Sequence, residues 1–382
     1  MEKDGVRLMD INFHYFAVMT IAVEAGFEQR WAQKIAEYSQ FVDDYTASAS
    51  YIFDEVPNFA LCLTTKTVLG YRFYPVTTGF SGLMDMARLT LKEKQKEILV
   101  PFHFIPTRRL SEIPEGANRR EYCTYPADIT GTSLIKNLIV DAKTKYMEER
   151  TTKNRMRLSM LLHTFADTYA HQNFSGFHGW ENFCYLTELK NTYTGKIFRD
   201  DMTPEKYYSL YAVGHTEVGH APDFTYASFE MDCAKNENQK KKDKFTGHYE
   251  RNNTNVFLDA ANQIFKILYQ IQHNNSDPTE KEWNRLKGKL IRGFRIKTTD
   301  TDTMGKEWNR ICPNIIYAYD VKALWQNLFV PREKGTEDAG KMVEGEEITE
   351  EEGAIPCVYK TADDNFFYYN VLAKEIRDAV IL

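Results

Sequence analysis

Three signals that often classify a protein are missing from this 382-residue sequence. Its six cysteines are scattered and none forms a CxxC pair, so we predict neither a thiolate zinc module nor a disulfide scaffold. No run of about 20 apolar residues occurs, so no membrane span is expected. The first residues lack a basic stretch followed by an apolar core, so no signal peptide is predicted. We therefore expect a cytoplasmic protein with reduced thiols, unless it is secreted by a route that needs no signal peptide.

A positive net charge is missing as well. The formal net charge is -6 and the sequence pI is about 5.9, which argues against a broad basic surface for nucleic acid. Apolar residues make up 43% of the chain and aromatic residues 14%, which is enough for a sizeable core. At this length the core belongs to one large domain or to two ordinary ones.

The most informative stretch is residues 158–182, LSMLLHTFADTYAHQNFSGFHGWEN. Within it His163, Asp167 and His171 recur at i, i+4 and i+8, so on a helix they share one face and drift only ~40° per step. Imidazole nitrogens and a carboxylate on one stripe match what a divalent metal ion binds. A single His-x-x-x-Asp is more often a satisfied polar pair, but three members in register favour a metal site.

Further candidate ligands lie upstream of this helix. A helix predicted over residues 10–25 carries a histidine in its first turn, where a capping or core role is the alternative. The next predicted helix, residues 27–46, has two adjacent acids near its end, which oppose the helix dipole unless a cation or solvent offsets them. A proline-bounded strip, residues 99–106, presents one histidine between two phenylalanines; a half-buried structural histidine is the alternative there. The upstream candidates are Asp10, His14, Asp43, Asp44 and His103.

Two groups downstream compete to complete the site. His178 and Glu181 lie in or after a glycine-containing turn. Residues 214–223, GHTEVGHAPD, form the second-densest ligand cluster, and their glycines permit close approach to another element. The sequence leaves open which group supplies the remaining ligands. The candidates in the second group are His215, Glu217, His220 and Asp223.

The predicted fold is mainly α, a multi-helix single domain with a few short β pieces. We assign residues 1–230 to a metal-binding helical core and residues 231–382 to a helical extension packed on or beside it. The polar segment 234–254 and the acidic segment 333–353 are expected to be flexible. The extension offers a surface for a protein partner.

The ligand chemistry indicates a hydrolytic metal site. Seven of the nine histidines fall in these few segments, which favours one multinuclear site over scattered core histidines. Histidine and carboxylate ligands without thiolate suit zinc, with manganese or iron as alternatives. Such a cluster polarises a phosphoryl oxygen and lowers the pKa of a bound water. The ligands therefore favour a hydrolytic metal cluster.

These residues resemble, in identity and order, the superfamily of zinc-dependent phospholipases C and single-strand-specific zinc nucleases. His14 matches its N-terminal histidine, Asp43 or Asp44 its aspartate on the next helix, and His103 its following histidine. The closest similarity is to a group of uncharacterised bacterial proteins with the segments FHY, PFHF, HTxADTxxHQxFSG and GHxxxGHxPD, and it covers residues 10–225. One departure is that the family's next histidine and glutamate are four residues apart, whereas His178 and Glu181 are three apart.

The resemblance implies a helical fold of the phospholipase C and nuclease type that hydrolyses phospholipid, nucleic acid or nucleotide with two or three zinc ions. It also implies that Asp167 orients the attacking water. Secreted members of the superfamily bind one zinc with their processed N-terminus, a role that Asp10 would take here. Two rival hypotheses are a catalytically silent, metal-stabilised binding or scaffold protein, and a toxin or defence effector whose C-terminal third binds a partner protein.

Overall fold

The computed structural model describes residues 11–47, 50–68, 70–79, 91–127, 133–200, 212–327, 354–356 and 363–382. In these ranges the protein is mainly helical with two small sheets, as the sequence predicts. Asp10 and the segment 333–353 lie outside the described residues. Among the described helices, none is both long and apolar enough to cross a membrane.

The helices before residue 200 build the framework of the candidate site. Two short stretches are π-helical, with backbone bonds that reach back five residues: η1 and η3. The bounds are η1 (Asn12–Ala17), α1 (Val18–Glu24), α2 (Gln29–Asp44), α4 (Lys92–Lys94), η3 (Gln95–His103), α5 (Leu134–Glu148) and α6 (Thr152–Ala170). Short 3-10 turns are η2 (Asn58–Leu63), η4 (Leu110–Glu112), η5 (Arg119–Tyr122) and η6 (Trp180–Asn182).

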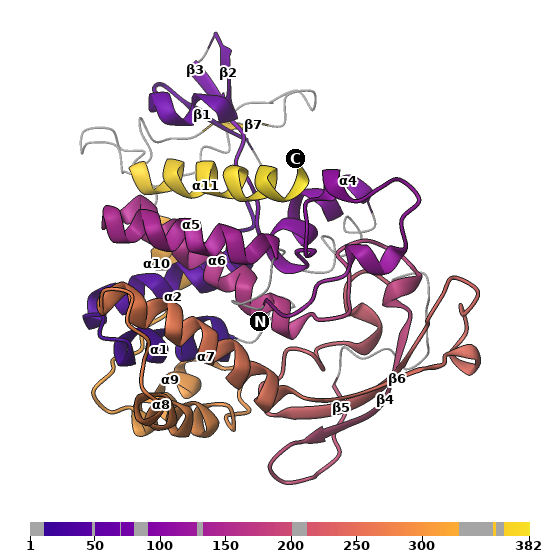
Figure 1. Ribbon diagram of the computed structural model, residues 1–382. Coiled ribbons are helices and arrows are strands. Elements are labelled where there is room, and N and C mark those ends of the chain that lie inside the picture. Colours follow the sequence, from indigo (N-terminus) through magenta and orange to yellow (C-terminus); the bar gives the residue numbers. More distant parts are fainter. Residues whose placement is uncertain are drawn as a thin grey trace.

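Helix α6 is the centre of the molecule. It begins after Thr151, whose hydroxyl accepts a hydrogen bond from the backbone N–H of Asn154 at 3.2 Å, as an N-cap residue does. It ends before His171, and Asn173 then turns the chain with a φ of 75°. Helices α2, α5 and the later helices α7 and α11 all pack against it (Figure 1). Fifteen of its nineteen residues are buried, which explains why polar side chains on this helix need partners.

The later helices close the same core. They are α7 (Asn253–Gln272), α8 (Glu280–Gly293), α9 (Thr301–Ile311), α10 (Val321–Gln326) and α11 (Asp364–Ile381), with the short turns η8 (Thr216–Val218) and η9 (Lys242–Lys244). Helix α7 packs on α1 and α6, and α11 packs on η3 and α6. The main hydrophobic core accordingly runs from Ile11 to Val380, so residues on both sides of position 230 share it.

Two small sheets flank the helices. The first has the strand order β2-β3-β1-β7, with bounds β1 (Ser50–Phe53), β2 (Thr64–Thr67), β3 (Gly70–Phe73) and β7 (Ala354–Pro356). The second is an antiparallel sheet with the order β4-β5-β6, with bounds β4 (Cys184–Asn191), β5 (Ala227–Cys233) and β6 (Gly247–Asn252). Strand β6 and η9 therefore occupy part of the segment 234–254.

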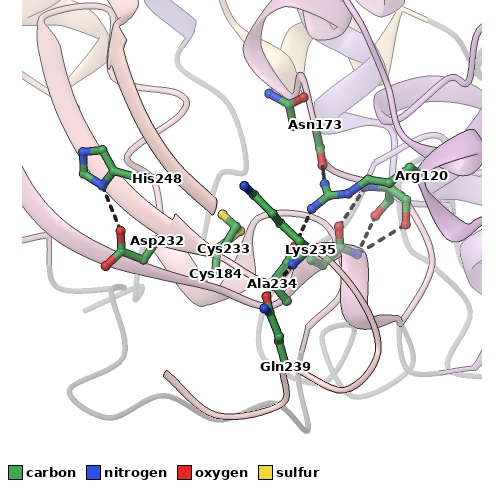
Figure 2. Close-up of a disulfide and its surroundings, with 11 residues drawn as sticks. Arg120, Asn173, Cys184, Asp232, Cys233, Ala234, Lys235, Gln239 and His248 are labelled. Carbon is green, nitrogen blue, oxygen red and sulfur yellow. Dashed lines mark hydrogen bonds and ion pairs between the residues drawn. A yellow bond between two sulfur atoms is a disulfide. The ribbon is translucent and has the colours of Figure 1, made fainter. Parts of the chain in front are cut away.

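A disulfide joins Cys184 to Cys233 across the second sheet (Figure 2). The two cysteines are directly paired in the register of β4 and β5, and both are buried. The prediction of reduced thiols is wrong for this pair, because 49 residues separate the cysteines and only strand pairing brings them together. Close by, the Arg120 guanidinium donates to the carbonyls of Asn173 and Ala234, and so ties this sheet to the turn after α6.

Candidate metal centre

The polar stripe of α6 is buried in the middle of the protein. His163 and Asp167 are 0% exposed and His171 is 2% exposed. Asp167 lies between the two histidines: its Oδ2 is 3.3 Å from His163 Nε2 and 3.7 Å from His171 Nδ1. The i, i+4, i+8 spacing therefore places all three side chains together, as the sequence predicts.

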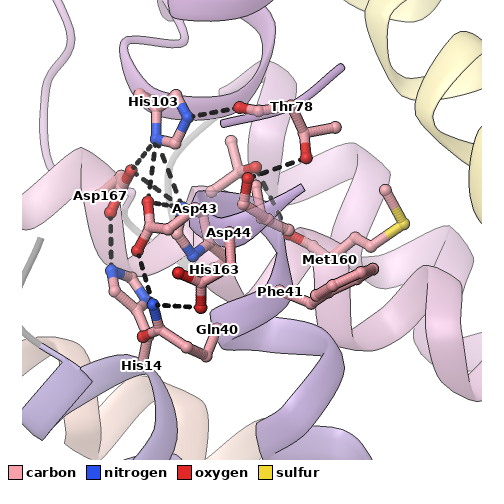
Figure 3. A network of polar contacts seen from close by, with 12 residues as sticks. His14, Gln40, Phe41, Asp43, Asp44, Thr78, His103, Met160, His163 and Asp167 are labelled. Atoms are coloured by element: carbon pink, nitrogen blue, oxygen red, sulfur yellow. Dashed lines mark hydrogen bonds and ion pairs between the residues drawn. The ribbon is translucent and has the colours of Figure 1, made fainter. Parts of the chain in front are cut away.

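Two further side chains complete a four-membered cluster around His163 and Asp167 (Figure 3). Asp43 comes from the last turn of α2, and His103 is the last residue of η3. Asp43 Oδ1 lies 3.7 Å from His103 Nδ1 and 3.6 Å from His163 Nε2. His103 Nδ1 lies 3.4 Å from His163 Nε2 and 3.1 Å from Asp167 Oδ2.

These separations match the edges of a metal-coordination tetrahedron. Ligand atoms about 2.0–2.1 Å from a zinc ion in tetrahedral geometry are about 3.3–3.4 Å from one another. Five of the six edges among the four ligand atoms of this cluster lie between 3.1 and 3.7 Å. The ligand atoms of Asp43, His103 and His163 therefore lie close enough to share one ion, and Asp167 Oδ2 lies 3.1 and 3.3 Å from the two histidine nitrogens of that group.

The second oxygen of Asp167 faces a different histidine. Asp167 Oδ1 is 3.1 Å from His14 Nε2, and the His14 ring stacks on His163 with centroids 4.0 Å apart. His14, His163 and Asp167 form a further group whose ligand atoms lie close enough to share an ion. A carboxylate whose two oxygens serve two neighbouring positions is suited to bridge two metal ions.

A separate triad lies at the C-terminal end of α6. His171 Nε2 is 3.3 Å and His215 Nε2 is 3.6 Å from Asp223 Oδ1. All three side chains are buried, and together they can hold an ion. Of the two downstream groups that the sequence left open, the structure thus brings His215 and Asp223 to the site. The positive φ of Gly214 and Gly219, 57° and 59°, permits the tight turns that place them there.

Backbone carbonyls orient the histidines. His103 Nε2 is 2.7 Å from the Thr78 carbonyl, which leaves Nδ1 directed at the cluster (Figure 3). His171 Nδ1 and His215 Nδ1 lie 2.8 Å from the carbonyls of His103 and Gly219, which leaves both Nε2 atoms directed at Asp223. A carbonyl that accepts the other ring N–H is the usual partner of a metal-binding histidine, because it fixes both tautomer and ring orientation.

The π-helical stretches place two of these histidines. His14 lies in η1 and His103 at the end of η3, where each wider turn changes the direction of the side chains relative to an α-helix. Single π-helical turns are frequent at functional sites for this reason. Pro101 lies within η3, and its missing N–H removes one donor from the regular helical pattern.

The electrostatics of the three ligand groups favour a bound cation. Burial lowers the pKa of His14 to about 3 and that of His215 to about 4, and burial raises the pKa of Asp43 and Asp223 to about 6. Although burial acts to raise it, the surrounding histidines hold the pKa of Asp167 well below its usual value. Within the described residues, Asp43 Oδ1 and Asp223 Oδ2 are buried and lack a hydrogen-bond partner. A bound cation supplies the missing partner of buried carboxylate oxygens that lie beside neutral imidazoles.

Two other predicted ligands have different partners. The carboxylate of Asp44 accepts hydrogen bonds from the Tyr319 hydroxyl at 2.5 Å and from Gln40 at 3.3 Å. His220 lies beside Asp200, with Nδ1 3.2 Å from Oδ1 of that carboxylate. Each is a close sequence neighbour of a residue in the cluster, but adjacent side chains on a turn or helix point in different directions.

The remaining candidates, His178, Glu181 and Glu217, lie outside the three ligand groups. Glu181 is buried and forms a two-pronged pair with Arg119, at 2.9 and 2.6 Å, and accepts a hydrogen bond from Ser175. His178 is exposed. Glu217 is buried in η8 outside the three ligand groups.

The groups that support the ligands are not recognisable in the sequence. The carbonyls of Thr78, His103 and Gly219 orient histidines, but a backbone carbonyl carries no signal in the residue type. Arg251 lies in the segment read as a flexible polar loop, yet it contacts the backbone beside two members of the triad. Its only sequence signal is its position in the short alternating run of β6.

Together, the fold and the site define a mainly helical protein with a buried histidine and carboxylate centre that fits metal ions. The chain belongs to a family of unknown function (DUF6765), whose model matches residues 9–381. Comparison with the curated proteins and with the solved structures finds no match. The match spans the described chain from η1 to α11, so the family includes the C-terminal helices as well as the segments that carry the candidate ligands.

Proposed function

We propose that this protein is a metal-dependent hydrolase of phosphoesters with a multinuclear zinc centre. The observation that carries the proposal is the close approach of the buried ligand atoms of Asp43, His103, His163 and Asp167, with the second oxygen of Asp167 facing His14. The order of these residues along the chain, which resembles that of the zinc phospholipases C and zinc nucleases, supports it.

The residues divide among three metal positions. Asp43, His103, His163 and one oxygen of Asp167 would hold the first ion, and His14 with the other oxygen of Asp167 would hold the second. His171, His215 and Asp223 would hold the third. Bound zinc would supply Lewis acidity toward a phosphoryl oxygen and would make a water nucleophilic at neutral pH.

The chain's own groups contribute orientation and a dry environment. Asp167 fixes the spacing of the first two positions because its two oxygens face different histidines. The same carboxylate is the candidate for orienting the attacking water. The Phe104 ring stacks on His171 with centroids 4.5 Å apart and shields that imidazole. In a site from which water is excluded, such fixed charges act more strongly on a phosphoryl group.

Metal analysis combined with assays on several substrates tests this proposal. The purified protein is analysed by plasma mass spectrometry, then assayed with bis(p-nitrophenyl) phosphate, phosphatidylcholine vesicles and single-stranded DNA. We expect up to three zinc ions per chain and turnover of at least one substrate. Asp167→Asn should lose the two ions that share this residue, keep the third, and lose hydrolysis.

A surface histidine provides the matched control. His248 lies on β6, is exposed, and pairs with Asp232 at 2.8 Å. The variant His248→Ala should keep the metal content and the activity of the unmodified protein. A protein that contains no metal, or an Asp167→Asn variant with unchanged metal content, would contradict the proposed centre.

The burial of the ligands favours a second candidate, a metal-stabilised protein without catalytic activity. None of the eight side chains in the three groups is more than 9% exposed, whereas a substrate must reach a catalytic ion. This alternative predicts that chelation lowers the melting temperature while the metal-loaded protein hydrolyses none of the three substrates. Hydrolysis that is lost on chelation and restored by zinc would exclude it.

A further inference from the structure

Arg251 connects the second sheet to the triad at the end of α6. It is the penultimate residue of β6 and is paired in register with Phe229 of β5. Its guanidinium carbon lies 5.5 Å over the Phe229 ring, and its Nε is shielded from solvent. This arginine lies outside the part of the sequence that resembles the zinc enzymes, and the proposed chemistry does not use it.

Each prong of the guanidinium binds the carbonyl that precedes a member of the triad. Nη1 donates to the carbonyl of Ala170 at 2.6 Å, and the next residue is His171. Nη2 donates to the carbonyl of Pro222 at 3.3 Å, and the next residue is Asp223. One rigid, planar group thus ties together two backbone segments that are 52 residues apart and carry two of the three ligands.

We propose that Arg251 is a positioning residue for the metal site formed by His171, His215 and Asp223. It acts on the backbone before two ligands and holds His171 Nε2 and Asp223 Oδ1 at the 3.3 Å separation that one zinc ion requires. This inference rests on the proposed metal centre and extends it to a residue that contacts neither metal nor substrate.

The location explains how a cation is tolerated beside a site for metal ions. Ala170 is the last residue of α6, so Nη1 binds at the helix C-terminus, where the helix dipole favours positive charge. Both prongs donate to carbonyl oxygens, whose dipoles stabilise the positive charge of the guanidinium. A lysine at this position would reach only one of the two carbonyls, because its ammonium lacks the planar fork.

Zinc binding by substituted proteins tests this role. The metal-free chain is titrated with zinc against a chromophoric chelator, and bound zinc is counted by plasma mass spectrometry. Arg251→Met keeps an unbranched apolar stem but removes every donor. It should weaken the binding of one zinc ion by about 10–100-fold, as loss of a group that orients metal ligands typically does. Arg251→Lys should lower the affinity for the same zinc ion by a smaller factor.

Two comparisons separate positioning from a general effect on folding. His215→Ala removes a ligand of the same site. The double variant His215→Ala/Arg251→Met should therefore bind the same number of zinc ions as His215→Ala alone. Arg150 is the matched control because it also donates to a carbonyl near a helix C-terminus, that of Ile271 in α7 at 3.0 Å, away from the metal groups. Arg150→Met should bind zinc like the unmodified protein.

The outcomes distinguish this inference from the proposed function. An Arg251→Met protein that binds zinc with unchanged number and affinity would overturn the positioning role, even if its melting temperature falls. If that variant does not fold, unchanged affinity in Arg251→Lys would overturn it instead. An unmodified protein that binds no zinc would overturn the metal centre itself, whereas zinc binding without hydrolysis would overturn only the proposed activity.

Discussion

Loss of the disulfide should cost several kcal/mol of stability without loss of metal. Cys184 and Cys233 close a loop with a sequence separation of 49 residues. In the chain-entropy model, a loop of this length restricts the unfolded state enough to stabilise the fold by about 4 kcal/mol at 25 °C. The double variant Cys184→Ala/Cys233→Ala tests this value, because alanine avoids burying two hydroxyl groups at positions that are 2% exposed.

The assay is equilibrium unfolding in urea followed by circular dichroism. The variant's free energy of unfolding should fall by about 4 kcal/mol, whereas Cys62→Ser, at an exposed free cysteine, should change it by about 0.5 kcal/mol or less. Thiol titration of the urea-unfolded protein should find two additional thiols after reduction. Metal content should stay constant, because the disulfide lies at the far end of the β4–β5 pair from the candidate ligands. Cys184 pairs with Cys233 at one end, whereas Ala227, which follows Asp223 by four residues, lies at the other end.

Two results would refute this reasoning. If reduction releases no additional thiols, the pairing of β4 with β5 does not bring the two sulfur atoms together. If the thiols appear but the double variant loses less than about 1 kcal/mol, the unfolded chain is already restricted, and the loop-entropy argument does not apply here.

Two further predictions concern buried side chains away from the metal groups. Glu181→Ala leaves the half-buried Arg119 without its carboxylate partner, so it should lower the free energy of unfolding by about 1–3 kcal/mol. Metal content should stay unchanged, and loss of an ion would show that Glu181 is a ligand. Gly293→Ala places a Cβ 2.1 Å from the buried Trp308 ring and should cost about 1–3 kcal/mol. Gly288→Ala in the same helix meets no atom within 4 Å and should stabilise by about 0.5–1 kcal/mol, so equal melting temperatures of the two variants would contradict the packing argument.

Helical periodicity carried most of what the sequence revealed about the site. The stripe of His163, Asp167 and His171 was visible because a helix of known period relates residues four apart, and α6 realises that relation. The predominance of helices followed from the same periodic pattern. Asp43 and His103 were recognisable as candidates by residue type and by their positions at segment ends, although nothing in the sequence measures their 3.7 Å separation.

Contacts between distant segments were beyond the sequence. Whether His178 and Glu181 or His215 and Asp223 reach the site depends on turns at glycines, and both pairs look alike as sequence. The pairing of Cys184 with Cys233 depends on the register of two strands 49 residues apart. Asp44 and His220 are also suitable ligand types next to residues of the three groups, and the sequence does not reveal that Asp44 contacts Tyr319 and that His220 contacts Asp200.

The arrangement of the ligands couples the metal centre to folding of the whole chain. The eight side chains come from η1, α2, η3, α6 and the turn around η8, so no single segment carries a site by itself. Two of them, Asp43 and Asp223, are carboxylates whose pKa burial raises to about 6, so without a cation their environment is unfavourable for negative charge. Because ions that bind only the folded chain stabilise it, metal bound by these groups would offset this cost at the point where α2, α6 and η3 meet. The C-terminal helices enclose the same core and Arg251 holds the end of α6, so the region beyond residue 230 helps to form the site although it contributes none of the eight ligands.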